Sequence, residues 1–252
     1  WSRHGALIQQ AKRRDGLETI GVPVSRLGAG RDRFLSEDAS LAMLAAAGIP
    51  SVPYAVCNSV EQAVAAWRSL GPEVVVKACS ALIPHKSEHG LVFLGLDSET
   101  HIVQAWNRCA QGVAALNVPF EGVIVARRVR GRREFALGVR QDPVFGTVVM
   151  IGDGGKYVEA LRDFVVLLYP ISEDDVIAKL QTLRIAPILD GVRGEPPLDL
   201  ATVAGVAVAL ARLSTTYQRD IASIDLNPLI IGGMGSGGWA VDAVIERTKE
   251  ES

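Results

Sequence analysis

Three residues near the C-terminal end carry oxygen atoms that could hold a divalent cation. Asp225 and Asn227 are two positions apart in an apolar segment, so on a strand their side chains share one face. Asp242 lies in a second apolar segment across a glycine-rich turn, and a hairpin would bring it beside Asn227. Carboxylate and amide oxygens of this kind suit magnesium together with phosphate and water. The alternative is a hydrogen-bonded turn that starts at Asn227-Pro228.

Lys77 interrupts a run of valines that is typical of a buried strand. A buried ammonium group is costly unless it has a partner. An anionic ligand such as phosphate is one possible partner, and a structural carboxylate is another. The side chain could also lie at an exposed end of the strand, and the residue types alone leave these alternatives open.

Two loops could hold an anion. The polar loop 84–90 contains His85, Lys86 and Ser87, whose side chains and backbone N–H groups suit a phosphate, and a histidine can be a nucleophile toward phosphorus. A solvated surface loop is the alternative. Gly154 and Gly155 end a glycine loop, residues 152–155, that would let a ligand approach the backbone closely. This loop matches neither the Walker pattern nor a dinucleotide-binding fingerprint.

The elements that would position these residues are read from periodicity and capping signals. Glu134, inside an otherwise apolar strand, is a further candidate site residue. Segments 122–129 and 134–140 flank an Arg-Gly-Arg-Arg sequence and predict a hairpin. The order of elements predicts an α+β protein rather than one doubly wound parallel sheet. Helices are expected over 37–47, 60–70, 98–116, 174–183 and 200–217, and strands over 52–56, 73–78, 91–94, 144–151, 221–226 and 239–244.

The composition excludes several classes of protein. The chain has 252 residues, 48% of them hydrophobic, and a formal net charge of -2, which argues against disorder and against nucleic-acid binding as the main task. No apolar run is long enough to predict a membrane span. The three cysteines are far apart, show no zinc spacing, and are expected to be small buried side chains in a reducing cytoplasm. Residues 1–33 end in a glycine and charge mixture that predicts a linker, and the chain is expected to be a piece of a longer one.

In this order the segments resemble the ATP-grasp domain of NDP-forming acyl-CoA synthetases. These include the ADP-forming acetyl-CoA synthetase beta subunit and its succinyl-CoA synthetase relatives. The likeness runs from about Leu35 to Ile245, and its segments are short but numerous. They are Val75-Val76-Lys77, His85-Lys86-Ser87, Glu134 with Gly138, 142–146, Gly154-Gly155 with Glu159 and Asp163, 190–194, 225–229 and 241–243.

The resemblance implies an ATP-grasp fold in residues 34–252, with ATP and Mg²⁺ between two α+β lobes. The smaller lobe would be inserted in the larger at about 50–125. His85 would be catalytic, as a carrier of the phosphoryl group. The nucleotide would be bound by Lys77, Lys86, Ser87, Glu134, Gly154 and Gly155, and the metal by Asn227, Asp242 and Asp225.

The family reaction joins a small carboxylic acid to CoA at the expense of ATP, through an acyl phosphate and a phosphohistidine. CoA would be bound mainly by domains that do not fit in this chain. Those domains, on the same polypeptide or on a partner subunit, are therefore expected partners, and the assembly is expected to be an oligomer. No nucleic-acid or membrane partner is expected.

Three positions depart from the family pattern. Leu91 replaces a second glycine after the His-Lys-Ser loop, Ala126 replaces a glutamine near the adenine, and Asp153 adds a negative charge near the expected phosphates. These departures favour an alternative function, a catalytically degenerate regulatory module like that of some protein acetyltransferases. A third, weaker alternative is an ATP-grasp ligase of another specificity, in which His85 would have no role.

Overall fold

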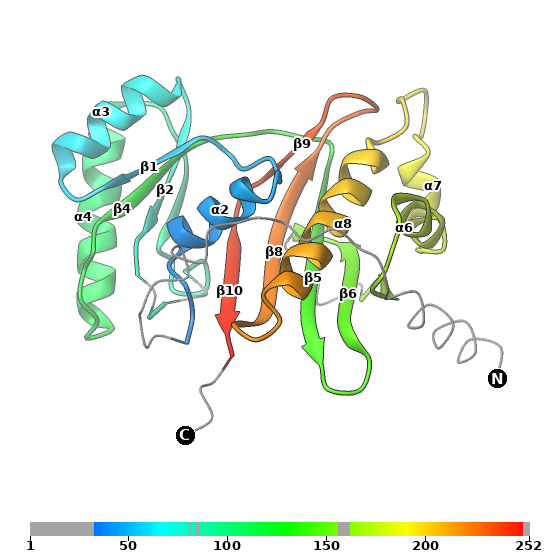
Figure 1. Cartoon of the computed structure of the whole chain (residues 1–252). Helices are drawn as coiled ribbons and strands as arrows, with labels where there is room; N and C mark the ends of the chain where they lie inside the picture. Colours follow the sequence, from blue (N-terminus) through cyan, green and yellow to red (C-terminus); the bar gives the residue numbers. More distant parts are fainter. Residues whose placement is uncertain (1–32, 81, 84–85, 156–161, 249–252) are drawn as a thin grey trace. The chain divides into compact units, whose positions relative to one another are not determined.

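The computed structural model describes residues 33–80, 82–83, 86–155 and 162–248. Apart from Arg33, the predicted linker lies outside this part of the chain. The described residues form two compact units (Figure 1). Unit 1 contains Arg33, Leu41–Ser51 and the chain from Gly131 onward, and unit 2 contains Phe34–Ser40 and Val52–Arg130. The smaller lobe predicted at about 50–125 stays a prediction.

Unit 2 is an antiparallel sheet with two helices packed on it. The strand order is β1-β4-β2-β3. The predicted serine caps of both helices are present, because Ser59 accepts a hydrogen bond from the Gln62 N–H and Ser98 accepts one from the His101 N–H. The elements are β1 (Tyr54–Cys57), α3 (Val60–Leu70), β2 (Val74–Ala78), β3 (Val92–Leu96), α4 (Glu99–Ala115) and β4 (Val123–Arg127), and α2 (Glu37–Ala46) spans both units.

The core of unit 2 lies between the sheet and helices α3 and α4. Cys57 and Cys109 belong to it, and all three cysteines are buried and free, which confirms their expected role as small buried side chains. Burial raises the pKa of the Cys109 thiol to about 12 and that of Cys79 to about 11. These thiols are therefore neutral packing groups near neutral pH.

Unit 1 is built on a second antiparallel sheet, in the order β10-β8-β5-β6-β7, with β9 also paired to β8. Strand β7 and helix α7 were not predicted from the sequence. Helix α8 begins after Asp199, whose side chain accepts a hydrogen bond from the Thr202 N–H as expected for an N-cap. The elements are β5 (Arg133–Asp142), β6 (Gly146–Asp153), β7 (Phe164–Leu168), α6 (Glu173–Leu180), α7 (Ala186–Leu189), α8 (Leu200–Thr216), β8 (Ile221–Ile231), β9 (Gly238–Ala240) and β10 (Ala243–Arg247).

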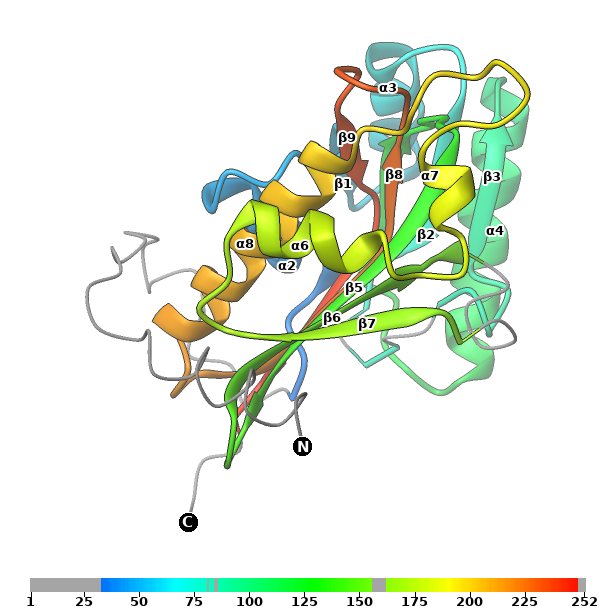
Figure 2. The same cartoon turned by 90° about the vertical axis from the view of Figure 1, so that its right-hand side faces the viewer.

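The two faces of this sheet differ in side-chain type. Helix α8 packs on β5, β6 and β8, with α6 beside it (Figure 2). Strand residues on this face, such as Leu137 and Leu226, are fully buried. Because side chains alternate along a strand, Glu134, Asp225 and Asn227 point to the opposite face, and all three are exposed. These three candidate site residues therefore lie on the face of this sheet that α8 does not cover.

The hairpin predicted across residues 122–140 is wrong. Strand β4 pairs with β1 and β2, whereas β5 pairs with β6 and β8 in the other sheet. Both edges of β4 are already paired, so it has no free edge for β5. Arg130 also bonds to Glu73 in unit 2, while Arg132 bonds to the Pro196 carbonyl in unit 1. The arginine-rich segment is thus a connection between two sheets and not a turn within one.

The helices of the described residues have no apolar stretch that could cross a lipid bilayer.

Candidate functional site

Three buried charged residues meet inside unit 2, and we call them the lysine cluster: Lys77, Lys86 and Glu37. The Lys77 Nζ donates to Glu37 Oε1 at 2.7 Å, and the Lys86 Nζ donates to Glu37 Oε2 at 2.8 Å. The side chains are 4%, 7% and 2% exposed, respectively. Lys77 comes from strand β2, Lys86 from the β2–β3 connection and Glu37 from the first turn of α2. Of the alternatives for Lys77, the exposed strand end is therefore wrong, and a structural carboxylate is present.

The charge on Glu37 depends on its two lysine partners. Burial by itself raises the pKa of this carboxyl, but the neighbouring ammonium groups and their hydrogen bonds outweigh burial and lower the pKa below 4.5. Its place in the first turn of a helix favours the anion as well. Glu37 was not predicted as a site residue. It is 40 residues before Lys77 in the chain, and no local spacing links the two.

The loop that carries Lys86 contains residues of opposite exposure. Lys86 is buried, whereas Ser87 is exposed to solvent. The Lys86 carbonyl accepts hydrogen bonds from the N–H groups of His89 and Leu91, which closes the loop into a tight turn. The surface-loop alternative thus fits Ser87 and not Lys86. His85, the predicted catalytic residue, lies outside the described residues.

A second group of polar residues lies on the paired strands β8 and β10 of unit 1 and the connection before β10, and we call it the oxygen cluster: Asp225, Asn227 and Asp242. The Asn227 N–H donates to the Asp242 carbonyl at 3.2 Å, and Ala243 faces Leu226 in the β8–β10 pair. The predicted hairpin contact between Asn227 and Asp242 is confirmed. The turn alternative at Asn227-Pro228 is wrong, because both residues lie inside β8.

A β-bulge positions Asn227. The register between β5 and β8 shifts between Phe135 and Leu137, opposite Leu226 to Leu229. Pro228 lies in this shift and has no N–H to donate to β5, so the bulge removes the need for that hydrogen bond. Bulges re-aim side chains and are frequent beside functional sites. Asn227 therefore lies at an irregular point of β8 rather than in a regular ladder.

The oxygen cluster is open rather than enclosed. Asp225 and Asn227 are exposed, and Asp242 is half-buried. Within the described ranges no three His, Cys, Asp or Glu side chains form a group that could hold a metal. The oxygen cluster has two carboxylates and one amide, so a bound Mg²⁺ would take its remaining ligands from phosphate and water, as this ion commonly does.

Glu134 is next to the glycine loop. The Gly154 N–H donates to the Glu134 carbonyl at 2.8 Å, and a Cβ at position 154 would lie 2.7 Å from the Phe135 backbone. Gly155 has φ +75°, and the space where its Cβ would be is occupied by the Glu134 carboxylate. Both positions thus require glycine. The structure brings these three predicted residues together on unit 1.

The negative charge of Asp153 is neutralised within its own sheet. Arg133 Nε donates to Asp153 Oδ1 at 2.7 Å, and its Nη2 donates to Oδ2 at 2.5 Å. This two-point pair is strong and directional, and Asp153 is only 6% exposed. The negative charge that the sequence places near the expected phosphates is therefore paired with Arg133.

The other two departures from the family pattern are packing residues. Leu91 is 2% exposed and belongs to the core of unit 2, where its side chain fills the space above Gly112 of α4. Ala126 is 3% exposed and packs with Cys79 and Ile124. Leu91 therefore adds apolar contact to the core. Ala126 has no polar side chain that could contact an adenine ring.

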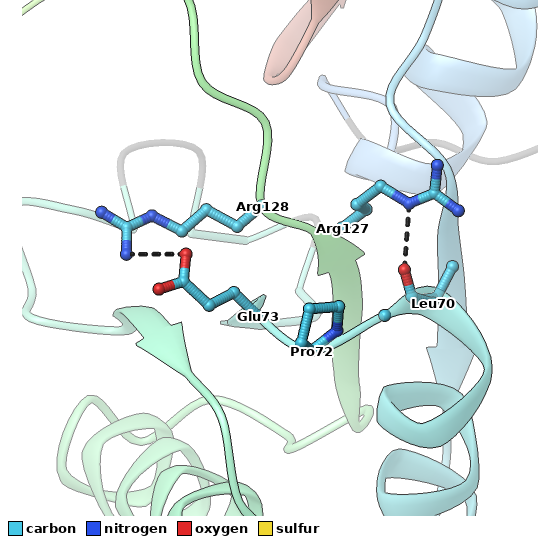
Figure 3. A pocket seen from close by; sticks show the side chains of 6 residues that line it. Leu70, Pro72, Glu73, Arg127 and Arg128 are labelled. Carbon is cyan, nitrogen blue, oxygen red and sulfur yellow. Dashed lines mark hydrogen bonds and ion pairs between the residues drawn. The ribbon is translucent and has the colours of Figure 1, made fainter.

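A surface hollow of about 390 Å³ is lined by the α3–β2 connection and the end of β4. Its two arginines point away from each other (Figure 3). Arg127 bonds to the Leu70 carbonyl and Arg128 to Glu73. Since these cations do not converge on one point, the hollow lacks the geometry of an anion site.

A family model described as an ATP-grasp domain matches residues 26–246, so the chain belongs to the ATP-grasp domain family. Its α+β fold and its resemblance to NDP-forming acyl-CoA synthetases are confirmed. It is similar to acetate–CoA ligase (ADP-forming) II subunit beta of Pyrococcus furiosus, with 30% identity over 90% of this chain and 97% of the relative.

Longer relatives contain the same region. The 4-hydroxybutyrate–CoA ligase (ADP-forming) of Nitrosopumilus maritimus is 32% identical over 84% of this chain, which covers 30% of that relative. A solved structure of a Ca. Korarchaeum cryptofilum dinucleotide-forming acetyl-coenzyme A synthetase has a TM-score of 0.72 and 29% identity, over 86% of this chain and 93% of that one. That synthetase is in complex with coenzyme A and Mg-AMPPCP, and its phosphohistidine segment points towards the nucleotide-binding site.

Proposed function

We propose that this chain is the ATP-binding, magnesium-dependent part of an NDP-forming acyl-CoA synthetase. The overall reaction is acid plus CoA plus ATP giving acyl-CoA, ADP and phosphate. One observation carries the proposal. This chain of the ATP-grasp family has two groups of polar residues, the lysine cluster in unit 2 and the oxygen cluster in unit 1.

Each set has a distinct task in this proposal. Lys77 and Lys86, with Ser87 beside them, contact the phosphate groups, because ammonium and hydroxyl donors suit phosphoryl oxygens. The oxygen cluster holds Mg²⁺, which neutralises charge on those groups when bound. Glu134, Gly154 and Gly155 form a backbone-lined edge for the nucleotide. His85 takes up the phosphoryl group, as its resemblance to the loop histidine of the family implies.

The chain needs partners to complete this reaction. The Pyrococcus furiosus relative is named as a beta subunit, whereas the Nitrosopumilus maritimus relative is a polypeptide of which this chain covers 30%. We propose that CoA and a small carboxylic acid are bound mainly by further domains, on the same polypeptide or a separate subunit. The regulatory alternative loses part of its basis, because the added charge of Asp153 is paired with Arg133.

Magnesium-dependent ATP binding by calorimetry, followed by phosphate uptake from γ-labelled ATP, tests the proposal. Wild-type protein should bind ATP more tightly with Mg²⁺ than without, and His85→Ala should bind it but take up no label. Asp242→Ala should lose the magnesium dependence. If the wild type neither binds ATP nor takes up phosphate, alone or with its partner domains, the proposal is wrong.

A further inference from the structure

The two lysines of the lysine cluster share one carboxylate, and each lysine uses a different oxygen of it. Lys77 is the next-to-last residue of strand β2 and Lys86 lies in a loop, so neither backbone position fixes the other. Glu37 is the group that ties their ammonium ends together. The arrangement is 2–7% exposed, so water does little to loosen it.

This buried arrangement is not what stability alone would select. Buried charged groups gain little over well-packed apolar side chains of similar volume, because their desolvation cost is large. Ile124 and Ala126, which lie on the Lys77 face of the same sheet, are buried and apolar, so such packing is available here. A role in ligand binding explains why three charges are retained inside unit 2.

Lys86 keeps donors for a ligand. Among the described residues Glu37 is the one side chain to which the Lys86 Nζ donates, and an ammonium has three N–H groups. A lysine side chain loses up to about 2 kcal/mol of rotamer entropy when it is fixed in one position. If Glu37 holds the side chain before the ligand arrives, that cost is not taken from the binding energy.

We infer that Glu37 is a positioning residue that holds Lys77 and Lys86 ready to receive the phosphate groups of the nucleotide. This inference rests on the proposed function. Glu37 is itself an anion, and it lies next to the proposed site for phosphate anions. Simple electrostatics predicts that removing its charge strengthens phosphate binding. Positioning predicts instead that removing the Glu37 carboxylate weakens phosphate binding.

The test compares ligands with and without phosphate. Calorimetric titration of Mg-ATP, Mg-ADP and adenosine is carried out on the wild type, Glu37→Gln, Glu37→Asp and the control Glu61→Gln. Glu61 is an exposed glutamate in the first turn of α3, so it matches Glu37 in type and helix position. We expect Glu37→Gln to lower the affinity for ATP and ADP about tenfold, while the affinity for adenosine should change less than twofold. Aspartate, one methylene shorter, should not restore binding, and Glu61→Gln should match the wild type.

A second variant guards against a folding defect. Lys86→Met leaves Glu37 paired with Lys77 and places a side chain of similar size in the buried position. It should weaken ATP about tenfold, and combining it with Glu37→Gln should add little, because both changes remove the same arrangement.

Three outcomes overturn the inference. ATP affinity that is unchanged or higher in Glu37→Gln would favour simple electrostatics. An equal loss for adenosine would show general damage to unit 2. Fully additive losses in the double variant would show that Glu37 and Lys86 act independently. A wild type that binds no ATP refutes the proposed function itself, which separates that failure from the failure of the inference.

Discussion

The lysine cluster and the oxygen cluster are built in opposite ways. The lysine cluster is enclosed, and its charges contact one another. The oxygen cluster lies on the face of its sheet opposite helix α8, where two of its three side chains are exposed. A buried cation needs a partner inside the protein because it has lost water, whereas exposed oxygen atoms can stay hydrated until a metal replaces the water.

The difference predicts how each cluster responds to substitution. Changes in the oxygen cluster should affect ligand binding and leave stability nearly unchanged. Changes in the lysine cluster should affect both, since the same contacts that position the ligand also satisfy buried charges. Measuring ligand affinity and the free energy of unfolding on the same variants tests this difference.

The largest expected effect is on magnesium-dependent binding in Asn227→Ala. Removing the amide oxygen takes away a proposed metal ligand, and we expect the affinity for Mg-ATP to fall about 1,000-fold. ATP without magnesium should bind as in the wild type. Asn227 is exposed, so the free energy of unfolding should change by less than about 0.5 kcal/mol. Calorimetry with and without Mg²⁺, together with urea unfolding, provides both measurements.

Asn107→Ala, on the exposed surface of α4, is the matched control and should change neither quantity. A large loss of stability in Asn227→Ala would show that the bulge, rather than a metal, needs the amide. That result would make the two clusters alike and contradict the comparison.

The next effect is the pH dependence of stability in the lysine cluster. Glu37→Gln should lower the free energy of unfolding by about 3 kcal/mol at pH 7. The pKa of Glu37 is lowered from 4.5 in the folded state, so its ionised form is favoured by folding. The stability that it contributes is therefore present above pH 4.5 and is lost as the pH falls through the lower, folded-state pKa.

Urea unfolding of the wild type and Glu37→Gln between pH 3 and 7 measures this difference. The difference in the free energy of unfolding between the two proteins should be constant above pH 4.5 and should become smaller in more acidic solution. A gap that does not change with pH would mean that the carboxylate charge is not what stabilises the lysine pair. Glu61→Gln again serves as the control.

A smaller effect is expected for the ion pair beside the glycine loop. Arg133→Met leaves the buried carboxylate of Asp153 without its cation, and we expect a loss of about 2 kcal/mol, since Arg133 itself is partly exposed. The double variant Arg133→Met with Asp153→Leu replaces the pair by apolar groups and should recover most of this loss. Thermal unfolding of the three proteins measures it, and a double variant as unstable as the single one would contradict the explanation.

The helices and strands that depend on local signals could be predicted from the sequence, whereas the pairing of distant strands could not. Capping serines before α3 and α4 and the valine run of β2 predicted these elements correctly, because such signals depend on neighbouring residues. The hairpin between Asn227 and Asp242 was also predictable, since a short turn separates its strands. The false hairpin at 122–140 had the same kind of local signal, but the partners of β4 come from elsewhere in the chain.

The candidate site shows the same limit. Lysine, histidine and carboxylate positions could be chosen by residue type, but their partners could not. Glu37 contacts residues 40 and 49 positions away, and Arg133 pairs with Asp153 across neighbouring strands. Whether a charge is free or neutralised is decided by tertiary packing. No local pattern could reveal that the negative charge of Asp153 is paired with Arg133.

The smallest expected effect is the loss of ATP affinity when Ser87 is replaced. Ser87 and its neighbour Lys86 differ in exposure, as the two clusters do. Ser87 is exposed while Lys86 is buried. If the Ser87 hydroxyl donates one hydrogen bond to a phosphate, Ser87→Ala should weaken ATP about fivefold, which corresponds to about 1 kcal/mol. Stability should not change, in contrast to the lysine-cluster variants. Thr100→Ala removes an exposed hydroxyl from α4 and is the control in the same titrations. A Ser87→Ala protein that binds ATP as tightly as the control would remove Ser87 from the phosphate contacts and leave the buried lysines of unit 2 to make them.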